Sequence, residues 1–146
     1  MKKKLLFTAS AAALLLCGCG GGAVNYDLPD QPAEFDVVTF TNPAVSTDAY
    51  ASFEYNGRTY IPFGTPADKF TGSDVRGCLG YITENGNKDE SSRVLLLSGD
   101  PDCNYLAVTD IDSPSLQTTV MRAIDTQKKD IRTPDCIHDE GYTFWQ

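Results

Sequence analysis

The chain contains few of the residues from which catalytic and metal sites are usually built. It has a single histidine, His138, and its five cysteines form no Cys-x-x-Cys pair, which argues against structural zinc. It has no Gly-x-Ser-x-Gly motif and no glycine-rich loop of the kind that cradles phosphate. The 12 Lys and Arg face 20 Asp and Glu, a formal net charge of −8. Clustered basic residues bind nucleic acid and anionic lipid, so this charge argues against both as the main partner.

The chain also lacks an apolar run long enough to span a bilayer comfortably. Its most apolar stretch, Leu5 to Leu16, follows three lysines and precedes Cys17-Gly18-Cys19 and a run of glycines. A basic start followed by a short apolar run is typical of a signal peptide. An ordinary secretory signal, cleaved without lipidation, is the alternative interpretation of this segment.

The sequence Leu16-Cys17-Gly18-Cys19 resembles the lipobox of bacterial lipoproteins. In that family a Leu stands three residues before, and a small residue directly before, the cysteine that becomes the lipidated N-terminus. The resemblance implies cleavage before Cys19, lipid such as palmitate on Cys19, and anchoring to the extracytoplasmic face of the cell membrane. Cys17 fits the acceptor position less well, because Leu16 would then stand directly before it.

This interpretation divides the chain into three parts: a signal peptide (1–18), the lipidated cysteine with a flexible tether rich in Gly, Asp and Pro (19–34), and a single β-rich domain (35–146). Cleavage removes three lysines, which leaves nine basic and twenty acidic residues and a formal net charge of −11. We expect this charge to keep an extracytoplasmic domain soluble.

The strongest local signal in the domain is the dipeptide Asn56-Gly57, which lies between two runs rich in aromatic residues. A two-residue type I′ turn needs positive φ at both central positions, and Asn and Gly tolerate it. The turn places Tyr55 opposite Arg58 and Phe53 opposite Tyr60, and continues the pairing to Tyr50 opposite Phe63. Large apolar side chains then lie on both faces of the hairpin, so we expect both faces to be covered.

Further strands are expected at 35–40, 78–83, 94–97 and 105–109, where β-branched and aromatic residues gather between turn signals. Residues 115–126 fit either a helix or a strand, and we favour the strand. Short helical turns are expected within 65–77 and near 133–136. The predicted fold class is therefore α+β, with a mostly antiparallel sheet around a central hairpin and one or two short helices.

The segments Phe-Glu-Tyr-Asn-Gly-Arg-Thr-Tyr-Ile-Pro (53–62) and Gly-Cys-Leu-Gly-Tyr-Ile (77–82) resemble small, uncharacterised envelope lipoproteins of Gram-positive bacteria. The resemblance implies a compact β-rich module and no particular activity.

Three cysteines remain in the domain, so it can form at most one internal disulfide. Cys103 and Cys136 both follow Pro-Asp in expected loops and form the candidate pair, whereas Cys78 begins an apolar strand. Cys136 also lies two residues from His138, which suggests a cysteine nucleophile with its base. A polar surface loop is the simpler interpretation of that sequence.

Asp100-Pro101-Asp102-Cys103-Asn104 has the spacing of the first three ligands in a calcium loop. Tyr105 then replaces the required glycine and Ile111 the bidentate glutamate, so an Asp-Pro turn is expected. A last hypothesis concerns aromatic residues at strand spacing, which could form the floor of a ligand groove or simply belong to the core. The candidate groove residues are Tyr50, Tyr55, Arg58, Tyr60, Phe63 and Tyr81.

Together these patterns predict a membrane-anchored extracytoplasmic lipoprotein that acts as a binding or interaction module, with no cofactor and no nucleic-acid partner. A small envelope enzyme using the Cys/His pair, or a calcium-binding accessory domain, is the alternative.

Overall fold

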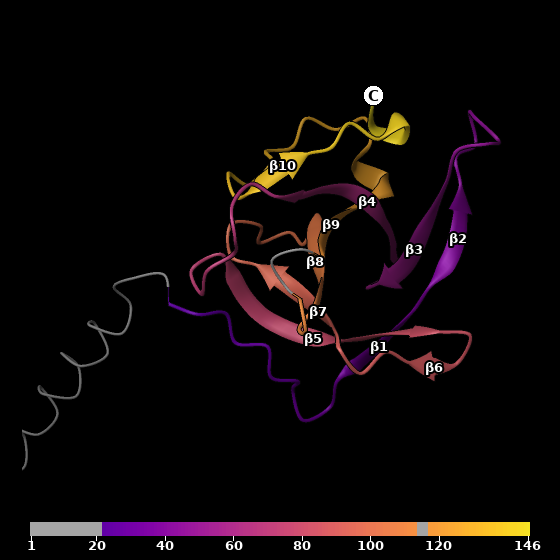
Figure 1. The fold of residues 1–146 in the computed structure, drawn as a ribbon. Coiled ribbons are helices and arrows are strands. Elements are labelled where there is room, and N and C mark those ends of the chain that lie inside the picture. Colours follow the sequence, from indigo (N-terminus) through magenta and orange to yellow (C-terminus); the bar gives the residue numbers. More distant parts are fainter. Residues whose placement is uncertain (1–21, 114–116) are drawn as a thin grey trace, which may run out of the picture.

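The computed structural model describes residues 22–113 and 117–146 (Figure 1). The predicted signal peptide and the candidate lipid site, Cys19, lie outside the described residues, as do residues 114–116 of the ambiguous segment. The strands are β1 (Ala33–Asp36), β2 (Val38–Thr41), β3 (Ala49–Tyr55), β4 (Arg58–Pro66), β5 (Val75–Glu84), β6 (Asn87–Lys88), β7 (Ser92–Leu97), β8 (Tyr105–Asp110), β9 (Thr118–Ala123) and β10 (Ile137–Asp139).

These strands form one curled sheet in the order β1-β5-β7-β8-β9-β4-β3-β2, with β10 on β4 and β6 on β5. Every pair is antiparallel except β1 and β5, which are parallel. The expected strand at 35–40 is broken at Val37, so that β1 pairs with β5 and β2 pairs with β3. A single stretch of chain therefore contributes to both ends of the sheet, and Figure 1 shows the sheet curling round to bring those ends together.

The prediction of an α+β fold is wrong. The only helical elements in the described residues are two 3₁₀ turns of three residues each, η1 (Ile124–Thr126) and η2 (Thr143–Trp145). The segments 65–77 and 133–136 contain strand ends, turns and bends instead of helix. β-branched and aromatic residues dominate the chain between its turns, and the few helix-compatible stretches are too short to nucleate a helix. The fold is an almost all-β curled sheet with one parallel pair.

The hairpin prediction is confirmed near its turn. Asn56 and Gly57 have φ of 51° and 74°, and Tyr55 pairs with Arg58 as Phe53 pairs with Tyr60. Beyond this pair the two strands change partners: β3 pairs with β2 and β4 pairs with β9. Tyr50 therefore lies opposite Phe40, not Phe63.

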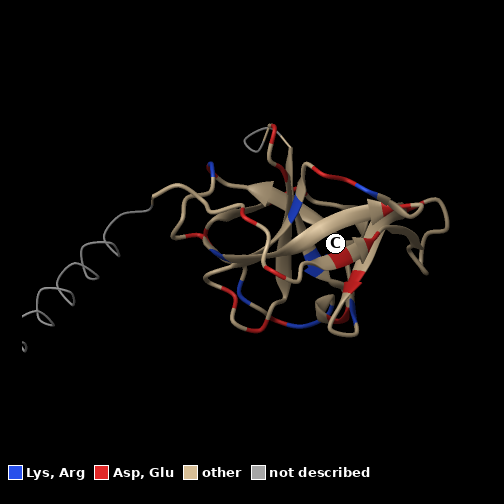
Figure 2. Cartoon of the chain, turned by 90° about the horizontal axis from the view of Figure 1, so that it is seen from below, with Lys and Arg blue, Asp and Glu red and all other residues tan. Residues whose placement is uncertain are grey.

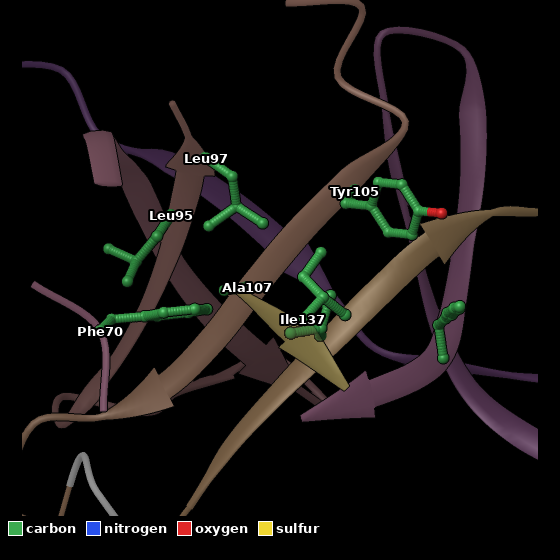
Figure 3. Packing of buried hydrophobic residues seen from close by; sticks show 8 residues of the cluster. Phe70, Leu95, Leu97, Tyr105, Ala107 and Ile137 are labelled. Carbon is green, nitrogen blue, oxygen red and sulfur yellow. The ribbon is translucent and has the colours of Figure 1, made fainter. Parts of the chain in front are cut away.

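Each face of the central strands β7, β8 and β9 carries its own core. The inner core lies inside the curl, where Phe35 of β1 meets Phe53 of β3 with ring centroids 5.2 Å apart. The outer core lies on the opposite face, under β10 and the segments near both termini (Figure 3). The inner core consists of Phe35, Phe53, Tyr60, Val94, Leu106, Met121 and Ala123; the outer core consists of Phe63, Phe70, Leu95, Leu97, Tyr105, Ala107, Val120 and Ile137.

Two further features of the core concern β7 and the C-terminus. The run Val94–Leu97 is covered on both faces, since Val94 and Leu95 belong to different cores and are both almost fully buried. The aromatic C-terminus packs against the domain: Phe144 is 5% exposed, and the Trp145 indole N–H donates to the Pro62 carbonyl at 2.7 Å. In the ambiguous segment 115–126, the strand prediction is confirmed for β9, whereas the last three residues form the 3₁₀ turn η1.

The segment expected to be a tether contacts the domain from Gly22 onward. Its side chains Val24 and Tyr26 pack against the outer core, and Arg93 donates to the Tyr26 carbonyl at 2.8 Å. The Gly72 N–H donates to the Gly22 carbonyl at 2.6 Å. No helix within 22–113 or 117–146 has the length and apolar character that crossing a bilayer requires.

Candidate functional site

A recess at one end of the curl, which we call the mouth, has both apolar and acidic lining residues. It has a volume of about 390 Å³, within the range of small-molecule sites. Its wall comes from the ends of β5 and β8, the start of β7 and β9, and the kink at Val37. The apolar lining residues are Val37, Ala51, Phe53, Pro62, Ile82, Val108 and Met121.

Three carboxylates, those of Glu84, Asp89 and Asp110, stand among the lining residues of the mouth, and the described lining contains no Lys or Arg. None of the three forms an ion pair with a described residue. A cleft lined by charges of one sign concentrates counter-ions of the other sign, so the mouth favours cations.

Local turns hold two of these carboxylates. One Asp89 oxygen accepts from the Ser91 backbone N–H at 3.1 Å, and one Asp110 oxygen accepts from the Asp112 N–H at 2.9 Å. Ser92, which is buried, donates to the Asp89 carbonyl and accepts from the Ile82 N–H, both at 2.8 Å. The turn that carries Asp89 is thereby tied to the wall of the mouth.

A second hollow of about 340 Å³ lies on the other face of the sheet, between Tyr26, the segment 65–70, Leu95 and the β8–β9 pair. Asp68 and Lys69 both line it, so its charges are balanced. A third, of about 510 Å³, lies along the seam where β1 approaches β3, and carries Glu34, Asp36 and Glu54. Figure 2 shows acidic positions spread over the turns around the sheet, with fewer basic positions among them.

The six candidate groove residues are not brought together. Tyr60 is fully buried in the inner core, whereas Phe63 is buried in the outer core on the opposite face. Tyr50 packs against Tyr142 with ring centroids 5.9 Å apart, and Tyr55 packs against Phe35. Because side chains alternate along a strand, these residues lie on both faces of the hairpin, and each face packs into a hydrophobic core.

Tyr81 lies elsewhere again, on the outside of β5. Its hydroxyl donates to a Glu34 carboxylate oxygen at 2.8 Å, and the Lys88 ammonium lies 4.3 Å from its ring centroid. The hydrogen bond to Glu34 raises the pKa of the Tyr81 hydroxyl.

Arg58 fastens the hairpin to the loop before β8 rather than facing a ligand. Its guanidinium donates to the carbonyls of Asp102 and Cys103, both at 3.0 Å, and to the Asn104 side chain at 2.8 Å. It also forms an ion pair with Asp125 at 3.0 Å. Beside it, burial raises the pKa of Tyr60 to about 12.

The three cysteines of the domain are all free thiols, so the structure contains no Cys103–Cys136 disulfide. Cys78 and Cys136 both pack against the outer core, and burial raises the pKa of each thiol. His138 is exposed on β10, where its backbone pairs with Thr65. A nucleophilic cysteine needs a lowered pKa, so Cys136 is poorly suited to that role.

The candidate calcium loop folds as a turn that uses its own acidic side chain. Asp100 is 5% exposed, and its carboxylate accepts from the Tyr105 backbone N–H at 2.7 Å. The Cys103 N–H donates to the Asp100 carbonyl, and Cys103 takes a φ of 53°. Among the described residues no three His, Cys, Asp or Glu side chains are grouped so that they could hold a metal.

Sequence reasoning did not single out the mouth. Its signal was present, since Glu84 and Asp110 directly follow two predicted strands, 78–83 and 105–109. What brings these strand ends together is the curl of the sheet, which depends on the break at Val37 and on the partner changes of β3 and β4.

Comparison with known proteins found no matching family model, no matching curated protein and no matching solved structure.

Proposed function

We propose that this chain is a lipid-anchored extracytoplasmic binding module and that its mouth takes a small organic cation with an apolar body. The observation that carries the proposal is the combination of an apolar floor with Glu84, Asp89 and Asp110 and with no basic side chain in the described lining. An apolar body would bury against Phe53, Val108 and Met121, while a cationic group would lie among the carboxylates.

The anchor rests on the lipobox-like sequence Leu16-Cys17-Gly18-Cys19. It places the protein on the outer face of the cell membrane, with the lipid on Cys19. Palmitate labelling in a bacterium that processes lipoproteins tests this part directly. Label should enter the wild-type chain and Cys17→Ala but not Cys19→Ala; label that survives in Cys19→Ala and disappears in Cys17→Ala would move the site to Cys17.

The ligand class is tested with two fluorescent probes that share an aromatic body. Dansylcadaverine carries a primary ammonium group, and dansylamide is neutral. The proposal predicts that dansylcadaverine binds more tightly and that its affinity falls as salt rises, since salt screens exposed charges. Equal affinity for the two probes, without salt dependence, would contradict a cation site.

Charge-removing variants then locate the interaction. Glu84→Gln should weaken dansylcadaverine binding by about 1.4- to 5-fold, the range for a partly exposed ion pair. Asp130→Asn removes the same charge from an exposed position that lines none of the three hollows, and serves as the matched control. Dansylamide binding should be unchanged in both variants.

A further inference from the structure

The contact between Gly22 and Gly72 bears on how the proposed anchor holds the domain. The Gly72 N–H donates to the Gly22 carbonyl at 2.6 Å, and a Cβ added at Gly72 would lie 3.0 Å from the Ala23 carbonyl oxygen. The two backbones therefore approach as closely as glycine allows.

The docking continues along the following residues. Val24 and Tyr26 pack against the outer core, and burial raises the pKa of the Tyr26 hydroxyl. The Arg93 guanidinium holds the Tyr26 carbonyl at 2.8 Å. The segment after Gly22 is thus attached to the domain by apolar packing as well as by hydrogen bonds, and adds nothing to the reach of a flexible spacer.

The length of chain left between the lipid and the domain is therefore small. Two residues, 20 and 21, lie between Cys19 and Gly22, so the connection is three residue steps long. A fully extended chain spans at most about 3.3–3.6 Å per step. The Gly22–Gly72 contact can thus lie no more than about 11 Å from the lipid-bearing residue. So short a connection keeps the Gly22–Gly72 contact close to the membrane surface.

β5 sets the direction of the rest of the molecule. It begins at Val75, just after the Gly72 contact, and its ten residues end at Glu84. A strand of this length spans about 30 Å, close to the full width of a small domain. In Figure 1 the start of β5 lies on the same side as the first described residues, and the β5–β6 hairpin lies on the opposite side.

We infer that the loop 67–74 faces the lipid headgroups and that the mouth opens at the end of the domain away from the membrane. The inference rests on the proposed lipid at Cys19. Ile82 and Glu84, which line the mouth, lie at the far end of β5. The partner of the loop 67–74 is the bilayer surface, held there by the covalent anchor and not by charge. The ligand accordingly enters from the aqueous side.

The inference is tested by measuring which end of β5 lies close to the lipid headgroups. The full lipidated chain is placed in phosphatidylcholine vesicles, some of whose lipids carry a nitroxide on the headgroup, which quenches fluorophores only at short range. An azide-bearing amino acid, introduced at Ser73 or at Asn87 and labelled by click chemistry, supplies the fluorophore. Both positions are exposed, and they lie near opposite ends of β5.

Fluorescence should be lost at position 73 and retained at position 87. A long Gly-Ser insertion after Gly21 should restore the fluorescence at 73 by freeing the domain. Equal quenching at both positions of a lipidated chain, or quenching at 87 alone, would overturn the inference while leaving the anchor intact. A chain that carries no lipid on Cys19 would overturn the proposed anchor and this inference together.

Discussion

Arg58 and Asp125 form an ion pair at 3.0 Å that joins the β3–β4 hairpin to the 3₁₀ turn after β9. The Arg58 side chain is only 23% exposed, because the same guanidinium also reaches the loop 102–104. One side chain thus connects three segments that are far apart in the sequence.

Replacing Arg58 by Ala should therefore lower the free energy of unfolding by about 1.5–3 kcal/mol, the range for hydrogen bonds that involve a charged group. Arg132→Ala is the matched control, since Arg132 is 78% exposed and pairs only with Asp135, itself 91% exposed. We expect that control to cost less than about 1 kcal/mol. Urea denaturation measures both, and equal effects would mean that Arg58 does not fasten the loop.

The same ion pair predicts how the free energy of unfolding changes with pH. The hydrogen bond from Arg58 lowers the pKa of Asp125 below its usual value. The unfolded chain then takes up a proton on this residue at a higher pH than the folded chain does. The contribution of Asp125 to stability is complete above the ordinary carboxyl pKa of about 3.9, and it is lost as the pH falls through the lowered value.

Asp125→Asn should consequently lose less stability than the wild type between about pH 5 and about pH 3. Urea midpoints measured across that range test the difference. Asp130→Asn is the control, because Asp130 is exposed and has no ion pair with a described residue. If the urea midpoints of the wild type and Asp125→Asn fell equally with pH, the lowered pKa of Asp125 would be contradicted.

The hairpin turn makes a prediction about backbone strain alone. Gly57 has a φ of 74°, and a Cβ added there would meet no atom within 4 Å. Gly57→Val should destabilise the domain by an amount on the order of 1–3 kcal/mol, because β-branched residues resist positive φ. Asn tolerates this region, so Gly57→Asn should cost clearly less. Chemical denaturation that found the two variants equally stable would argue against the type I′ turn.

How far the sequence predicts the fold depends on the distance over which each signal acts. The turn at Asn56-Gly57 and the apolar run at Val94–Leu97 have local causes, and both predictions are confirmed. The predicted strand pairing beyond the turn was wrong, because Tyr50 pairs with Phe40 of β2 instead of with Phe63. The strand β2 exists because the chain breaks at Val37, and no local sequence signal marks that break. The segment 133–136, where a helical turn was predicted, instead bonds to distant parts of the chain: Thr133 to the Tyr105 hydroxyl of β8, and the Cys136 carbonyl to the Ala67 N–H.

The candidate site was harder to predict for the same reason. The aromatic character of residues such as Tyr60 and Phe63 indicates burial, but it does not show whether they line a groove or belong to the core. Each face of the hairpin is covered by a different part of the chain, so both residues belong to the core. The mouth is formed by strand ends, and strand ends meet only once the sheet has curled.

The cysteines make a chemical prediction. With all three domain thiols free, a thiol reagent applied to the denatured protein without reductant should titrate Cys78, Cys103 and Cys136. A single reactive thiol would instead reveal a disulfide. In the folded protein, alkylation of Cys78 and Cys136 should require a more alkaline pH than for an unburied cysteine. Burial raises both pKa values, and only the thiolate reacts.

The most direct test of the central claim is to map where dansylcadaverine binds by NMR of the folded domain. If the probe binds in the mouth, the methyl resonances of the lining residues Val37, Ile82, Val108 and Met121 should shift with probe concentration. Leu97 and Ile137, which are buried in the outer core, should be unaffected. Shifts confined to Tyr26 and the segment 65–70 would place the site in the opposite hollow and contradict the assignment of the mouth.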